Sequence, residues 1–127
     1  MPQPHQIRLQ GPWMLHAGDQ PPQRVDLPSQ WPVVAALSEP RRLTRHFNCP
    51  TGLMPADRVE LVLAHFPPLG DVQVNDQPLG RSPAVGAEFR VEITPHLQSR
   101  NLISVALQDA SAESDIPPQA HLEIFAG

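Results

Sequence analysis

The sequence has no tyrosine, one cysteine and little charge of either sign, and each shortage excludes a class of protein. The single cysteine, Cys49, allows no internal disulfide, so nothing indicates an oxidising compartment. Nine Lys and Arg against 13 Asp and Glu give a net charge of −4, which argues against the basic surface that nucleic-acid binding requires. No apolar run approaches the roughly 18 residues that span a bilayer, and residues 1–10 do not resemble a signal peptide. We therefore expect a soluble, cytoplasmic protein that binds neither nucleic acid nor membrane.

Patterns that carry catalytic or metal chemistry are also missing. The six histidines form no H-x-x-x-H pair and have no cysteine partner, so no zinc site is expected. There is no nucleophile elbow, no phosphate-binding loop and no acidic calcium loop. Glycoside hydrolysis needs two facing carboxylates, but spacing singles out no pair, and Glu113 and Asp115 fit a solvated loop. We predict no metal, no cofactor and no catalytic residue.

Proline is abundant, with 17 residues against 7 glycines, and it is scattered along the chain. This leaves little room for long helices and suits short strands joined by many turns. Apolar and polar residues alternate with the period of a strand in about nine short segments. Such segments fall within residues 7–9, 11–17, 23–28, 41–48, 57–66, 70–80 (a hairpin), 87–94, 101–109 and 120–126. Residues 57–66 are apolar on both faces and therefore predict a strand inside a sheet.

Helix is expected only as short turns. Residues 29–39 fit one short helix, which Ser29 could cap and in which Pro32 suits the first turn. Residues 95–99 fit a single turn. Without alternation of strands and helices, a parallel sheet is not expected. We predict one domain, residues 1–127, with an all-β fold: an antiparallel β-sandwich, specifically a jelly roll.

The order of these segments resembles the sugar-binding domain of family 2 glycoside hydrolases, the group that includes β-galactosidases, β-glucuronidases and β-mannosidases. The resemblance covers nearly the whole chain, and its most specific part runs from Val72 to Leu107. It rests on GPW at 11–13, VDLPSQW at 25–31, RLTRHFNCP at 42–50, RVELVL at 58–63, VQVNDQPLG at 72–80, FRVEITPHL at 89–97 and NLISVAL at 101–107. The resemblance implies a galactose-binding-like jelly roll, consistent with the fold predicted from alternation.

The segment VQVNDQPLG resembles a hairpin element of that family. Asn75 matches the family's asparagine, and Asp76 stands where glycine is usual but still tolerates a turn. Leu79 is expected to reach the core, with Gly80 allowing the chain to turn. The next segment, RSPAVGAE, lacks the aromatic residue usual there. The family's immunoglobulin-like domain and catalytic barrel have no counterpart in this sequence, and the barrel carries the catalytic carboxylates. The resemblance therefore implies no enzyme activity.

A sugar site needs aromatic rings and planar polar groups, and this sequence supplies few of either. Trp13 and Trp31 are the candidates for stacking, with core packing as the alternative for each. Arg45, Asn75 and Glu92 are the polar candidates, and turn formation is the alternative for Asn75. The basic cluster that Arg45 forms with Arg41 and Arg42 is interpreted as a solvated strand face.

Three functions remain open at this stage. The first is a non-catalytic carbohydrate-binding module, as the resemblance implies. The second is a protein-interaction or homodimerisation module that keeps the fold without binding sugar, which the shortage of aromatic residues favours. The third is a small enzyme with an unrecognised site. A concave groove containing an exposed tryptophan would favour the first function, and a flat apolar patch would favour the second.

Overall fold

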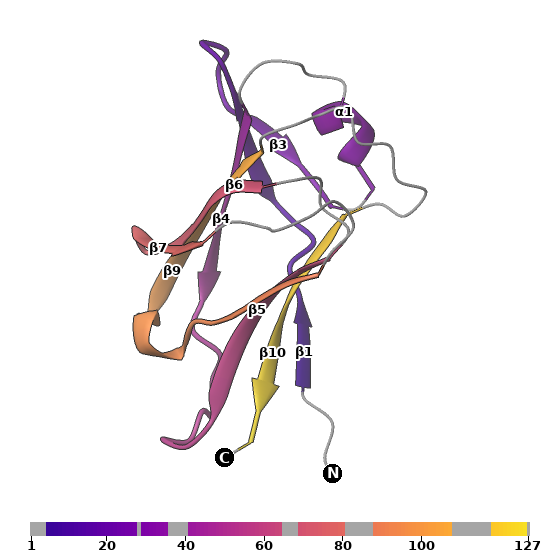
Figure 1. Cartoon of the computed structure of the whole chain (residues 1–127). Helices are drawn as coiled ribbons and strands as arrows, with labels where there is room; N and C mark the ends of the chain where they lie inside the picture. The colour runs from indigo at the N-terminus through magenta and orange to yellow at the C-terminus, as the bar shows by residue number, and fades with distance from the viewer. Residues whose placement is uncertain are drawn as a thin grey trace.

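Two antiparallel sheets pack face to face in the computed structural model, which describes residues 5–27, 29–35, 41–64, 69–80, 88–107 and 118–126 (Figure 1). The predicted all-β antiparallel sandwich is therefore confirmed, whereas the jelly-roll connectivity stays a prediction. The loops expected around residues 81–87 and 108–117, which include Glu113 and Asp115, lie outside the described residues.

The smaller sheet has four strands and the larger has six. In spatial order, the smaller sheet contains β1 (His5–Arg8), β10 (Gln119–Phe125), β5 (Arg58–Ala64) and β8 (Phe89–Glu92). The larger contains β3 (Gln23–Val25), β2 (Trp13–Ala17), β4 (Arg41–Asn48), β9 (Arg100–Leu107), β6 (Leu69–Val74) and β7 (Gln77–Gly80). The first and last strands of the chain lie side by side, so both ends of the chain emerge from the same part of the molecule (Figure 1).

The described residues contain two short helical segments, α1 (Trp31–Ala35) and the 3₁₀ turn η1 (Thr94–His96). Both lie where the sequence predicts a short helix or turn. Pro32 and Pro95 each occupy the first turn, where the missing N–H of proline costs no hydrogen bond. Neither segment has the length or the apolar character of a membrane-spanning helix.

The core forms between the facing surfaces of the two sheets. On β5, Val59, Leu61 and Leu63 point inward and are completely buried. Val62 points to the opposite face of the same strand and is also buried. This two-sided apolar character follows from the position of β5 between β10 and β8, and it confirms the prediction that this strand is internal.

The β6–β7 hairpin turns at the two residues that the sequence predicts. Asn75 and Asp76 have φ angles of 53° and 67°, in the left-handed region that asparagine and aspartate tolerate better than other non-glycine residues. Two consecutive positive φ angles are the mark of the turn that best matches the twist of a two-residue hairpin. Leu79 is partly buried and packs against the core, as expected.

A candidate ligand-binding cleft

The two tryptophans predicted to stack on a sugar both belong to the packing of the fold. Trp13 is completely buried on β2, and its indole Nε1 donates a 2.8 Å hydrogen bond to the Leu9 carbonyl. It offers no ring face to a ligand, which corrects the stacking expectation in favour of core packing. Trp31 begins α1 and is partly buried against the core cluster.

Asn75 holds the β6–β7 hairpin to its neighbours. Its Oδ1 accepts a 2.9 Å hydrogen bond from the Leu102 amide, and its Nδ2 donates 2.8 Å hydrogen bonds to the His96 carbonyl and to Asn101 Oδ1. Both ends of the side-chain amide are therefore engaged within the protein. This pattern fits the alternative role of turn former and leaves little hydrogen-bonding capacity for a ligand.

Glu92 and Arg45 lie on different sheets. Glu92 is exposed on edge strand β8, directly opposite Glu60 of β5. Arg45 lies on β4 between the inward-facing residues Leu43 and Phe47, so it is on the inner face of the larger sheet. The structure thus does not gather the five predicted residues into one site, and Arg45 is the one that lines a cleft.

The interpretation of the basic cluster as a solvated strand face is wrong for two of its three members. Arg41 is buried, and its Nη1 donates a 2.7 Å hydrogen bond to the Val34 carbonyl of α1. Arg45 is only half-buried but faces inward, whereas Arg42 points to the outer face and bonds to Ser104. Because successive side chains of a strand point to opposite faces, Arg41 and Arg45 lie on the same side as Leu43, and this side is the inner face of the sheet.

Arg45 is held in place by backbone carbonyls. Its two terminal nitrogens donate hydrogen bonds of 2.9 Å to the His46 carbonyl and 3.1 Å to the Gly11 carbonyl. Its Nε is buried and has no hydrogen-bond partner. Burial lowers the pKa of Arg45 from its ordinary value, since desolvation disfavours the charged form. The guanidinium nevertheless stays charged at physiological pH.

The cleft beside Arg45 exists because two strand edges are left unpaired. Strand β2 pairs with β4 only from Thr44 back to Arg41, so residues 45–48 of β4 have β9 on one side and no strand partner on the other in the described structure. Strand β1 is likewise the edge of the smaller sheet. The cleft between these edges has a volume of about 550 Å³. It is lined by Ile7, Arg8, Leu9, Arg45, His46, Phe47, Asn48, Arg100 and Leu122.

The lining of this cleft combines an apolar floor with basic side chains. Four apolar residues, Ile7, Leu9, Phe47 and Leu122, come from both sheets. Three arginines and one histidine lie among them, and none of the described residues that line the cleft is an aspartate or glutamate. Such a surface can cover an apolar ligand face and donate hydrogen bonds to oxygen atoms at the ligand's edge.

Comparison with solved structures places this architecture among known proteins, whereas no protein-family model and no curated protein sequence matches the chain. An FMN-binding β-glucuronidase from Facaelibacterium prausnitzii L2-6 has a TM-score of 0.76 at 20% identity, over 96% of this chain and 22% of that one. A β-glucuronidase from Bacteroides uniformis has a TM-score of 0.73 at 16% identity, over 96% and 18%. A glycosyl hydrolase family 2 member from Bacteroides cellulosilyticus DSM 14838 has a TM-score of 0.70 at 16% identity, over 94% and 20%.

The chain has the fold of one domain of family 2 glycoside hydrolases. The resemblance seen in the order of sequence motifs is thus confirmed at the level of fold. The chain spans about a fifth of the length of these family 2 structures. A shared fold does not transfer an activity, so the function has to be argued from the residues of this chain.

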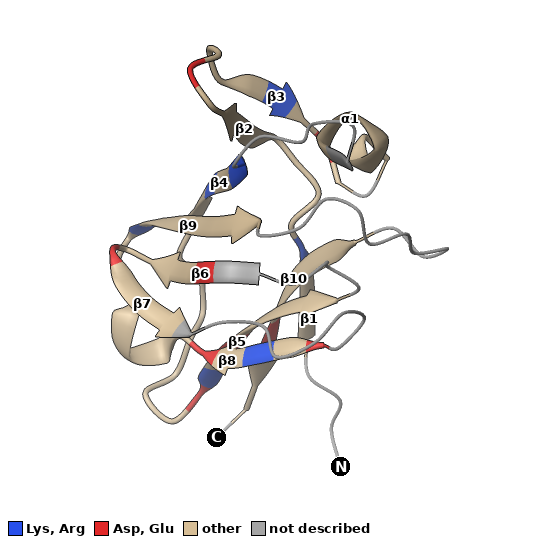
Figure 2. Ribbon diagram, turned by 45° about the horizontal axis from the view of Figure 1, so that its top comes forward, with Lys and Arg blue, Asp and Glu red and all other residues tan. Residues whose placement is uncertain are grey.

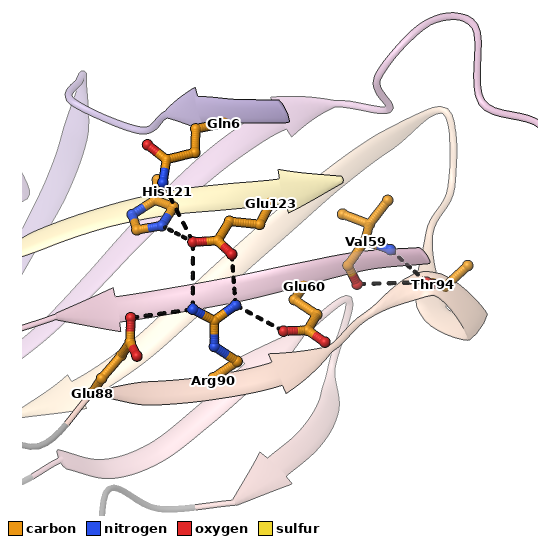
Figure 3. A network of polar contacts seen from close by, with 8 residues as sticks. All are labelled: Gln6, Val59, Glu60, Glu88, Arg90, Thr94, His121 and Glu123. Atoms are coloured by element: carbon orange, nitrogen blue, oxygen red, sulfur yellow. Dashed lines mark hydrogen bonds and ion pairs between the residues drawn. The ribbon is translucent and has the colours of Figure 1, made fainter. Parts of the chain in front are cut away.

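A second polar cluster of this family 2 fold lies on the outer face of the smaller sheet (Figure 3). Arg90 of β8 donates through Nη1 to Glu123 Oε1 at 2.7 Å and to Glu60 Oε1 at 2.9 Å, while Nη2 lies 3.3 Å from Glu88 Oε1. His121 Nε2 lies 2.8 Å from the other oxygen of Glu123. Figure 2 shows the same arrangement along β8, where a basic segment lies between two acidic segments.

The charged groups of this cluster pair with one another. The Arg90 hydrogen bond lowers the pKa of the Glu123 carboxyl below its ordinary value, and His121 adds to the effect against the opposing influence of burial. The same carboxylates raise the pKa of Arg90. No group of three or more metal-ligating side chains with the arrangement of a metal site occurs in the described parts of the chain. We therefore assign this cluster to the stability of the sheet.

Sequence reasoning missed most of the cleft. Arg8 comes from the first strand, Arg100 begins the ninth and Leu122 belongs to the last, so no local spacing links them. One signal was present in the sequence. Arg45 lies between the apolar residues Leu43 and Phe47 on one face of the strand, and a charge at a core-facing position often marks the rim of a site.

Proposed function

We propose that this chain is a non-catalytic carbohydrate-binding module and that the cleft between β1 and β4 holds the saccharide. One observation carries the proposal: the cleft joins apolar side chains to fixed hydrogen-bond donors in a volume of about 550 Å³. Small-molecule sites usually have volumes of about 300–1,000 Å³ and combine apolar side chains with a few placed polar groups.

The chemistry of a pyranose matches this lining. A sugar ring has an apolar face of C–H groups and an edge of hydroxyl oxygens. Ile7 is partly exposed and offers apolar surface, and the guanidinium of Arg45 is preorganised by its carbonyl hydrogen bonds. A fixed donor loses less entropy on binding than a mobile one, which favours affinity.

The absence of carboxylates in this lining supports a non-catalytic role. Most glycoside hydrolases use two carboxylates that flank the scissile bond. The residues that line the cleft include none. Glu60 and Glu123, which face each other on neighbouring strands, are both engaged by Arg90 on a sheet face.

A protein-interaction module is the second candidate, and it would be favoured by a flat apolar patch. Among the described residues, the large hydrophobic side chains that are exposed are Val33 and Met54. They do not amount to a patch of that kind. The saccharide function therefore has the stronger support.

Backbone amide NMR tests the proposed site directly. Titration with a panel of neutral and acidic oligosaccharides should shift the amides of residues 7–9 and 45–48 saturably. The Arg45→Met variant should need a higher oligosaccharide concentration to reach the same shifts, and Arg24→Met serves as the matched control because Arg24 is exposed on β3 and does not line the cleft. Saturable shifts elsewhere, or none with any saccharide, would reject the proposed function.

A further inference from the structure

The cleft concentrates positive charge in a protein whose net charge is negative. All nine basic residues of the sequence are arginines, and three of them, Arg8, Arg45 and Arg100, line this one cleft. The chain as a whole carries a net charge of −4. A concave site lined by charges of one sign focuses its electric field and favours ligands of the opposite sign.

These arginines differ from Arg90, which three carboxylates surround. Among the described residues, no carboxylate forms an ion pair with Arg8, Arg45 or Arg100. Within the same part of the chain, the hydrogen bonds of Arg45 go to two neutral carbonyl oxygens, and its buried Nε has no hydrogen-bond partner. A half-buried cation without a counter-ion is unfavourable, because it has lost part of its hydration without gaining a compensating charge.

We propose that the cleft selects an acidic saccharide, whose anionic group pairs with Arg45 and is flanked by Arg8 and Arg100. The proposal rests on the proposed function for the saccharide itself and adds the sign of the ligand's charge. A guanidinium offers several N–H donors in one plane, and pairs of charged groups form stronger hydrogen bonds than neutral pairs. The apolar residues of the same cleft would lie against the sugar ring.

Two features favour a small acidic saccharide over a nucleic-acid backbone. The cleft has a volume of about 550 Å³, within the usual range of small-molecule sites. The negative net charge would repel a long polyanion, whose binding depends on releasing many counterions. A uronate carboxylate and a sulfate ester share the chemistry that the arginines recognise, so the experiment has to separate these two sources.

Isothermal titration calorimetry with four probes tests whether the cleft selects an acidic saccharide. The probes are trigalacturonate, its fully methyl-esterified form, galactotriose sulfate and inorganic sulfate. We expect the acid to bind about tenfold or more tightly than the neutral ester, the difference expected from one charge-assisted contact. Binding should weaken when the salt concentration rises from about 20 to about 200 mM, since salt screens exposed charges.

Substitutions of single arginines show which side chains cause the preference for the acid. Arg45→Met and Arg100→Met should each reduce the affinity for the acid about tenfold and leave the affinity for the ester within about threefold, while Arg24→Met changes neither. Arg100 is exposed at the start of β9, so Arg100→Met keeps the test valid should Arg45→Met fold poorly. Tighter binding of galactotriose sulfate than of trigalacturonate would identify sulfate as the preferred anion.

The remaining outcomes separate the two proposals. Equal affinities for acid and ester, both lost in Arg45→Met, would overturn the charge selectivity and keep the carbohydrate-binding function. Inorganic sulfate binding as tightly as either sugar would show that the ring contributes nothing, which overturns the saccharide assignment. No binding by any probe or by the neutral oligosaccharides would overturn both.

Discussion

Arg90 and Arg45 show how one residue type is used in two ways within the same sandwich. Arg90 lies on the outer face of the smaller sheet, where three carboxylates surround its guanidinium. Arg45 lies on the inner face of the larger sheet and donates hydrogen bonds to two carbonyl oxygens, and no carboxylate of the described residues pairs with it. The charge of Arg90 is thus compensated within the protein, whereas no described carboxylate compensates that of Arg45. This difference is the basis for assigning Arg90 to stability and for proposing Arg45 as a binding residue.

Substitution of Arg90 should lower the stability of the folded protein more than substitution of Arg45. Arg90→Met leaves Glu60, Glu88 and Glu123 close together without their common cation. We expect a loss of about 1–2 kcal/mol in the free energy of unfolding, below the roughly 3–5 kcal/mol of fully buried pairs, because the side chain of Arg90 is 36% exposed. Urea unfolding measures this value, with Arg24→Met as the control. A variant as stable as the parent would contradict the structural role of the cluster.

Acid should produce a smaller effect at the same cluster. The pKa of Glu123 is lower in the folded protein than in the unfolded chain, so its contribution to stability is fully present above the unfolded pKa of about 4.3. That contribution is lost as the pH falls through the folded pKa. Urea unfolding between about pH 6 and pH 3 should show less loss in Glu123→Gln than in the parent. Identical pH profiles would mean that Glu123 titrates normally.

Arg45→Met should separate binding from stability. The methionine keeps most of the apolar stem and removes a cation that has no counter-charge. We expect the free energy of unfolding to change by less than about 1 kcal/mol in either direction, since the loss of two carbonyl hydrogen bonds is offset by relief of the unpaired charge. Thermal unfolding without ligand checks this expectation. A destabilisation larger than that of Arg90→Met would make Arg45 a structural residue and remove the contrast.

Glu92→Gln should have the smallest effect. Glu92 is exposed, lies opposite Glu60 and forms no ion pair with a described residue. Removing its charge relieves a like-charge contact, and we expect a change within about 0.5 kcal/mol, towards higher stability. Affinity for oligosaccharides should be unchanged, because Glu92 does not line the cleft. A loss of oligosaccharide affinity in Glu92→Gln would show that Glu92 contributes to binding, as the sequence predicts.

Local patterns account for what could be predicted of the fold. Residues 57–66 predict an internal strand because apolar residues occur on both of its faces, and β5 has this environment, with Leu61 buried on one face and Val62 on the other. The pair Asn75 and Asp76 predicts a turn because both tolerate positive φ, and both adopt it. These features depend on neighbours in the sequence, so the sequence alone specifies them.

The candidate site depends on relations that are not local. Arg8 and Arg100 approach Arg45 only when β1 and β9 take their places in different sheets. The cleft also requires β2 to end its pairing at Thr44, a boundary that no residue pattern marked. Trp13 illustrates the opposite error. A scarce aromatic residue invites a binding role, but its burial on β2 follows from which face of that strand meets the core.

The pairing of β1 with β10 has a consequence for the order in which the fold assembles. Gln6 and Glu123 are 117 residues apart and become neighbours only when these two strands meet. In the described structure β10 is the strand that pairs with β1, and it also brings Leu122 to the cleft. Contacts between residues so far apart in sequence carry a larger loop-closure cost than contacts between nearby strands. We therefore expect the cleft beside Arg45 to be completed late in folding, after the local β6–β7 and β2–β3 hairpins have formed.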